Sequence, residues 1–234
     1  MTVDELFHHA GRFVGCLAVR RDAHAGVALA TQGHDYPSLG ACAARDAAGL
    51  CAIHHDRKPG MCGVVPLDPR APAALQAIVL QRRHREAAFL DADCIAPGPR
   101  DGFDPLVEGE CIVDAAYLDA FDRYRAALNV EDAHWGRDVL EWMRPELARR
   151  AGTLTPDGYL ALSLVPMLAV LSRRSAAERE RCVGYARRQV PLIADNVARA
   201  VQRRHAADRP FTEELRRFAS QYTHFMQSLE RAPP

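Results

Sequence analysis

From Ile112 onward, apolar residues recur at spacings of three and four, which is the period of an amphipathic helix. One such stripe covers residues 117–128 and another covers residues 190–201. Asp208 and Thr212 are expected to cap a last helix. Because an apolar stripe must be buried against another element, this half of the chain predicts four or five helices packed as a bundle.

The chain has a different character up to about residue 110, where it is rich in Gly, Pro, Cys and His and its apolar runs are short. The runs "FVGCLAV" (13–19) and "GVALAT" (26–31) predict short strands or extended segments. Prolines ahead of apolar positions predict a helix over residues 72–90. The Pro, Gly and Asp content between Cys94 and Cys111 is typical of a loop.

These two halves together predict the fold class. We expect a mainly α protein in which a small, irregular, cysteine-rich metal-binding region, residues 1–110, packs on a helical bundle, residues 111–234. A chain of 234 residues can bury a substantial core, so the two parts are expected to form one compact unit.

Charge and hydropathy exclude several kinds of partner. Lys and Arg total 30, as do Asp and Glu, so no basic excess indicates nucleic acid. No apolar run reaches the ~20 residues that a membrane helix needs, and the N-terminal sequence lacks a signal-peptide pattern. We therefore expect a cytoplasmic protein with no nucleic-acid or membrane partner; a protein partner stays open.

Three cysteines lie close together in "CAARDAAGLCAIHHDRKPGMC", at Cys42, Cys51 and Cys62. Gly49 precedes the second cysteine and Pro59-Gly60 precedes the third, so both follow residues suited to tight turns. Seven cysteines, an odd number, in a reducing compartment favour metal-binding thiolates over disulfides. The alternative is three reduced cysteines that are buried separately.

The pattern C-x8-C-x-I-H-x2-R-x-P-x2-C, from Cys42 to Cys62, resembles the signature of the YkgJ-type cysteine-cluster family, described as zinc- or iron-chelating domains. Asp46 and Gly49 fall where the family has Asp and Gly, and Arg57 and Pro59 match its Arg-Pro with Lys58 inserted. The same cluster occurs in flagellin lysine-N-methylases. Two departures are that Gly63 replaces the family's Arg and that only Cys16 stands where the family has a denser group of cysteines.

The resemblance implies a metal centre whose ligands are Cys16, Cys42, Cys51 and Cys62. Cys94 and Cys111, at the ends of a loop, are the other cysteines considered for the fourth position. Cys182 is expected to be an ordinary helix residue.

Histidines are weaker candidates for this centre. At most one of the adjacent His54 and His55 is expected to reach a metal, because neighbouring side chains point in different directions. His34 is expected at the surface. With Asp35 and Tyr36 it forms a polar cluster near the site, so a supporting role beside the metal is the alternative.

Four thiolates suit either a tetrahedral zinc ion or a [4Fe–4S] cluster. Spacings of eight and ten residues favour the iron–sulfur cluster, because structural zinc sites usually draw ligands in pairs two to four residues apart. Zinc is the alternative, especially if His54 contributes a nitrogen.

Three functions follow from these observations. The first is a YkgJ-type protein that binds a metal or an iron–sulfur cluster. The second is a methylase-like enzyme with a structural cluster; whether the chain is an enzyme is left open, and no catalytic residue is assigned. No phosphate loop, nucleophile elbow, zinc-protease motif or glycine-rich stretch for S-adenosylmethionine is present. The third is a helical interaction protein that holds no metal.

Overall fold

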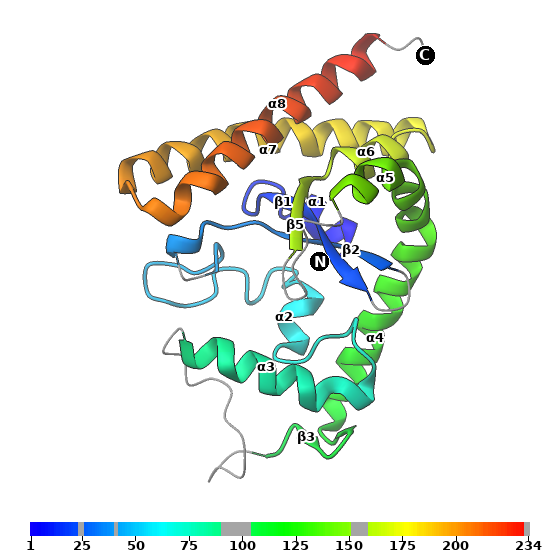
Figure 1. Ribbon diagram of the computed structural model, residues 1–234, viewed down its shortest axis with the longest axis vertical. Helices are drawn as coiled ribbons and strands as arrows, with labels where there is room; N and C mark the ends of the chain where they lie inside the picture. The colour runs from blue at the N-terminus through cyan, green and yellow to red at the C-terminus, as the bar shows by residue number, and fades with distance from the viewer. Residues whose placement is uncertain (23–25, 40–41, 90–103, 151–158, 232–234) are drawn as a thin grey trace. The chain divides into compact units, whose positions relative to one another are not determined.

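The computed structural model describes residues 1–22, 26–39, 42–89, 104–150 and 159–231. The protein is mainly helical with a small sheet (Figure 1). It divides into two compact units: unit 1 comprises residues 1–52 and 131–234, and unit 2 comprises residues 53–130. These boundaries differ from the expected division at residue 110.

An antiparallel sheet forms the centre of unit 1, with strand order β2-β1-β5. The strands are β1 (Gly15–Asp22), β2 (Gly26–Gly33) and β5 (Tyr159–Ser163). In the middle strand Cys16 lies opposite Gln32 on one side and Ser163 on the other. The extended segments predicted at 13–19 and 26–31 are therefore confirmed, whereas β5 was not anticipated.

Helices complete unit 1, and α7 and α8 pack against each other beside α6 (Figure 1). The helical elements are α1 (Val3–His8), η1 (Pro37–Leu39), η3 (Asp132–Gly136), α5 (Arg137–Arg150), α6 (Val165–Leu171), α7 (Ala176–Arg203), η5 (Ala206–Asp208) and α8 (Arg209–Arg231). The buried face of α8 presents Leu215, Phe218, Tyr222 and Phe225 at spacings of three and four. They join residues of the sheet and of α1, α5, α6 and α7 in one hydrophobic core.

A buried glutamine on α7 holds the backbone segment that leads into β1. The side-chain oxygen of Gln189 accepts a hydrogen bond from the backbone N–H of Gly15 at 3.0 Å. Its amide nitrogen donates to the carbonyl oxygens of Ala10 at 2.7 Å and Phe13 at 3.0 Å. The turn between α1 and β1 is thereby held on α7, because its buried backbone groups find their partners there.

Unit 2 contains mostly short elements and a smaller core. Its elements are α2 (Gly60–Val64), η2 (Ala73–Leu75), α3 (Gln76–Phe89), β3 (Val107–Glu108), β4 (Cys111–Ile112) and α4 (Ala115–Glu131), whose last residue belongs to unit 1. Val64 and Leu67 pack with Phe121, Tyr124 and Leu128, on one face of α4.

The helices and their ends agree with the sequence expectations only in part. The helix predicted over residues 72–90 is confirmed as η2 and α3. The apolar run that precedes α6 is a strand, and Pro166 lies in the first turn of α6, where a proline fits. Asp208 does precede α8, but its carboxylate accepts hydrogen bonds from Ser38 and Arg203. In the part of the chain that the structure describes, no helix is long and apolar enough to cross a membrane.

Candidate metal centre

Cys42 and Cys51 lie on the two arms of one tight loop in unit 1. The backbone N–H of Asp46 donates to the carbonyl of Leu50 at 2.9 Å, and the N–H of Ala52 donates to that of Ala44 at 2.8 Å. These two bonds flank Arg45 and Cys51, which pair as an isolated antiparallel bridge. Two opposite residues that exchange no backbone hydrogen bond with each other, but have hydrogen bonds on both sides, form a non-hydrogen-bonded antiparallel pair. The side chains of such a pair lie close together.

The tip of this loop is built by the two residues that match the family pattern. The carboxylate of Asp46 accepts hydrogen bonds from the N–H groups of Ala48 at 2.9 Å and Leu50 at 2.8 Å. Gly49 has a φ of +82°, which glycine adopts without the strain of a Cβ. The expectation that Gly49 serves a tight turn before Cys51 is confirmed.

The two thiols of the loop have different polar neighbours. The Sγ of Cys42 accepts a hydrogen bond from the backbone N–H of Ala44 at 3.4 Å. Cys51 lies opposite Arg45 in the bridge, and the guanidinium of Arg45 lies over Gly49. Both cysteines are exposed and therefore accessible to a metal.

Arg45 was missed by the sequence reasoning. Its proximity to Cys51 follows from the register of the loop, which Asp46 and Gly49 set by forming the turn. The sequence D-x-x-G between the two cysteines indicates a turn. This turn pattern could have predicted that Arg45 lies opposite Cys51.

Cys62 lies in the first turn of α2, in unit 2. Its backbone N–H donates to the carbonyl of Pro59 at 2.8 Å, and Pro59 precedes the helix as its N-cap. Arg57, two residues before Pro59, has a φ of +43°, which is uncommon for a residue with a Cβ. Cys62 is exposed. The unit boundary after Ala52 separates this helix from the loop that carries Cys42 and Cys51.

Cys16 has a different environment from the three exposed thiols. It is fully buried in β1, the middle strand of the sheet. Burial raises the pKa of the Cys16 thiol to about 12, and the carboxylate of Glu214 adds to this effect. A thiol with that pKa is protonated at neutral pH, whereas a metal ligand must be a thiolate. Its role as the fourth ligand stays a prediction.

The remaining cysteines follow their local structure. Cys111 is exposed in β4, and Cys94 lies outside the described residues. Cys182 is buried in α7, which confirms the expectation of an ordinary helix residue, and burial raises its pKa to about 12.

Two groups of histidines were considered for the site. The rings of His54 and His55 are perpendicular, at an interplanar angle of 88°, and both residues are exposed. His34 is buried, which corrects the expectation of a surface position. Its Nε2 lies 2.9 Å from a carboxylate oxygen of Glu214, and its ring stacks on Phe211. In this structure His34 therefore connects the end of β2 to α8.

Within the described ranges, no group of three or more His, Cys, Asp or Glu side chains is gathered as a ligand set. The assignment of Cys42, Cys51 and Cys62 to one metal centre thus stays a prediction. No protein-family model, curated protein or solved structure matches the chain.

Proposed function

We propose that this protein binds a metal centre through thiolates of Cys42, Cys51 and Cys62. The observation that carries the proposal is the loop of residues 42–52. It exposes two cysteines, directs a backbone N–H at the sulfur of Cys42 and places Arg45 beside Cys51. Two exposed thiols on one loop are accessible to a metal, which would bind them as thiolates.

The proposed centre is a [4Fe–4S] cluster, with zinc as the alternative. The spacing of the three cysteines supports the cluster, since none of them forms the close pair that is usual for structural zinc. A cluster ligated by cysteines alone needs a fourth thiolate. Cys16 is the first candidate from the resemblance, and Cys111 and Cys94 are the others; His54 suits zinc better.

The test is anaerobic purification of the full chain, followed by measurement of iron, acid-labile sulfide and zinc per chain and of the visible absorption spectrum. We expect a brown protein with iron and sulfide in equal amounts. A colourless protein that binds one zinc tightly would replace the cluster with a zinc site. A folded protein that binds neither after reconstitution contradicts the proposal.

Single replacements assign the ligands. Cys42→Ser, Cys51→Ser and Cys62→Ser should each lower the bound metal strongly, whereas Cys182→Ser, at a buried helix position, should leave it unchanged. Cys16→Ala tests the fourth position against Cys111→Ser. Far-UV circular dichroism of each variant separates a lost ligand from a lost fold.

A further inference from the structure

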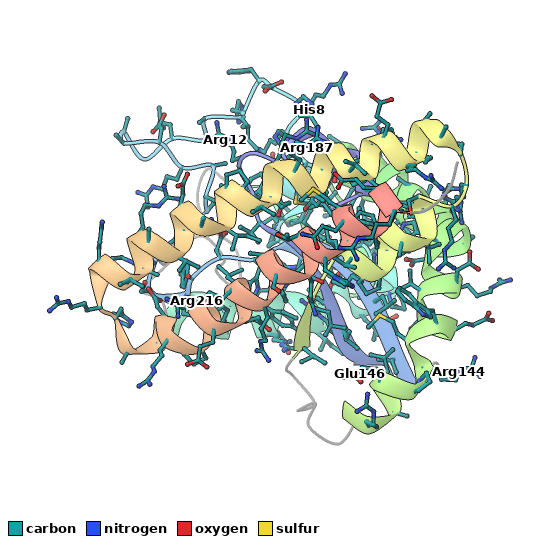
Figure 2. All side chains as sticks on the ribbon, turned by 90° about the horizontal axis from the view of Figure 1, so that it is seen from above. His8, Arg12, Arg144, Glu146, Arg187 and Arg216 are labelled. Atoms are coloured by element: carbon teal, nitrogen blue, oxygen red, sulfur yellow. The ribbon has the colours of Figure 1, made fainter. Side chains whose placement is uncertain are left out.

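A depression of about 380 Å³ lies at the corner where α7 ends, η5 follows and α8 begins. Its lining includes Arg204, His205, Arg209 and Arg216, together with the small or apolar side chains of Ala200 and Val201. All of these residues belong to unit 1. Figure 2 shows Arg216 on α8.

Two acidic residues, Asp208 and Glu213, also line the depression. Asp208 is 2% exposed, and one of its carboxylate oxygens lies 2.9 Å from a guanidinium nitrogen of Arg203 and 2.6 Å from the hydroxyl of Ser38. Glu213 lies 4.0 Å from Arg209, and both side chains are largely exposed. Among the residues that the structure describes, neither Arg204 nor Arg216 has an ion-pair partner. The depression therefore has two uncompensated guanidinium groups in its lining.

The other groups of the lining add hydrogen-bond donors. The Nδ1 of His205 accepts the backbone N–H of Ala207 at 3.3 Å, so the neutral ring carries its proton on Nε2 and can donate it. The depression also lies at the N-terminus of α8, a helix of 23 residues whose dipole favours negative charge there. Val201, 54% exposed, offers an apolar contact beside these donors.

Arg204 occupies a position where glycine would be less strained. It ends α7 in the left-handed conformation, with φ of +56° and ψ of +27°. Helices commonly end with glycine in this conformation, because a Cβ is disfavoured there. The position thus carries a guanidinium group despite a conformational cost.

We propose that this corner binds a small organic anion, a phosphate or carboxylate attached to an apolar group, through Arg204, Arg216 and His205. Guanidinium groups bind both kinds of anion with paired hydrogen bonds. The apolar part of the ligand would contact Val201. This site contains no cysteine, so its test does not depend on the proposed metal centre.

The test is isothermal titration of the full chain at low ionic strength with three probes: inorganic phosphate, phenyl phosphate and phenylacetate. We expect saturable binding of phenyl phosphate or phenylacetate, tighter than that of inorganic phosphate because of the apolar contact. The tighter of the two aromatic probes identifies the anion. No saturable binding of either aromatic probe contradicts the proposal.

Variants separate this site from general charge attraction. Arg216→Gln should weaken binding about tenfold, as expected for the loss of a hydrogen bond to a charged group. Arg217→Gln, at the neighbouring exposed position that does not line the depression, should leave it unchanged although it removes the same charge. Equal losses in both variants would overturn the proposal.

Arg204→Gly gives a test in which stability and binding change in different directions. Removal of the guanidinium should weaken binding, while glycine at a positive φ should leave the midpoint of thermal unfolding unchanged or raise it. A purely structural role for Arg204 predicts a lower midpoint and unchanged binding, which would contradict the proposal.

Discussion

At the scale of single residues, Glu131 shows how burial can make an acidic side chain sensitive to pH near neutrality. Its carboxylate accepts a hydrogen bond from the backbone N–H of Val3 at 2.6 Å. Burial raises the pKa of Glu131 to about 7, although this hydrogen bond acts in the opposite direction; the carboxylates of Asp4 and Glu5 also raise it. The folded protein therefore keeps a proton on Glu131 at pH values where the unfolded chain has lost it.

This pKa predicts a specific pH dependence of stability. Between pH 4.5, the ordinary value for Glu, and about pH 7, the folded state binds the extra proton, so the free energy of unfolding should fall as pH rises. Glu131→Gln keeps the acceptor for Val3 but does not ionise. It should be more stable than the wild type above pH 7, with the difference vanishing below about pH 4.5.

Urea unfolding from pH 4 to 8 measures this difference, and Glu141→Gln is the matched control because Glu141 is exposed on α5. A difference between Glu131→Gln and the wild type that does not change with pH would show that Glu131 titrates normally in the fold.

At the scale of elements, the short helix α2 contains two glycines in very different surroundings. A Cβ at Gly60 would overlap Cδ2 and Cε2 of the Tyr124 ring. A Cβ at Gly63, one turn later, would have no atom of the described residues within 4 Å. The close approach of α2 to α4 therefore depends on Gly60 and not on Gly63.

Gly60→Ala should destabilise the protein by about 1–3 kcal/mol, the usual cost of forcing an extra carbon into a packed interface. Gly63→Ala should be neutral or stabilising by up to about 1 kcal/mol, because alanine loses less backbone entropy in a helix. Chemical denaturation of both variants checks the pair. Equal effects would mean that Tyr124 is free to move away from Gly60.

The elements also show what local sequence can and cannot predict. Strands β1 and β2 and the helices α3, α4, α7 and α8 were predictable, because their apolar residues have a local period or are bounded by turn residues. Strand β5 was not, since "YLALS" runs directly into the apolar sequence of α6. Its assignment depends on β1, a strand far away in the chain. That pairing also explains why the two ends of the chain share one unit.

The local structure of the candidate metal centre was likewise predictable only in part. The turn at Gly49 and the turn before Cys62 could be read from local residues. The burial of Cys16 could not, because an apolar flank fits an extended segment at an edge as well as one in the middle of a sheet. The pairing of Arg45 with Cys51 required the register of the loop, which composition does not reveal.

At the scale of the whole molecule, the described residues form two separate hydrophobic cores. The larger core lies within unit 1 and includes the sheet and α6, α7 and α8. The smaller lies within unit 2, and its buried members in the described ranges are Val64, Leu67, Ile112, Phe121, Tyr124 and Leu128. Because regions with little buried apolar surface open at lower free energy, unit 2 should unfold locally before unit 1 does.

A matched pair of Phe→Leu replacements tests this independence by native-state hydrogen exchange. Phe121 is fully buried in the core of unit 2, and Phe225 is 5% exposed in the core of unit 1. Each replacement leaves a small cavity. Phe121→Leu should speed exchange in α2 and in residues 115–130 of α4 while α7 and α8 keep their protection, and Phe225→Leu should speed exchange in α7 and α8. If Phe121→Leu instead speeds exchange equally throughout the chain, the two cores unfold together and the protein behaves as a single cooperative unit.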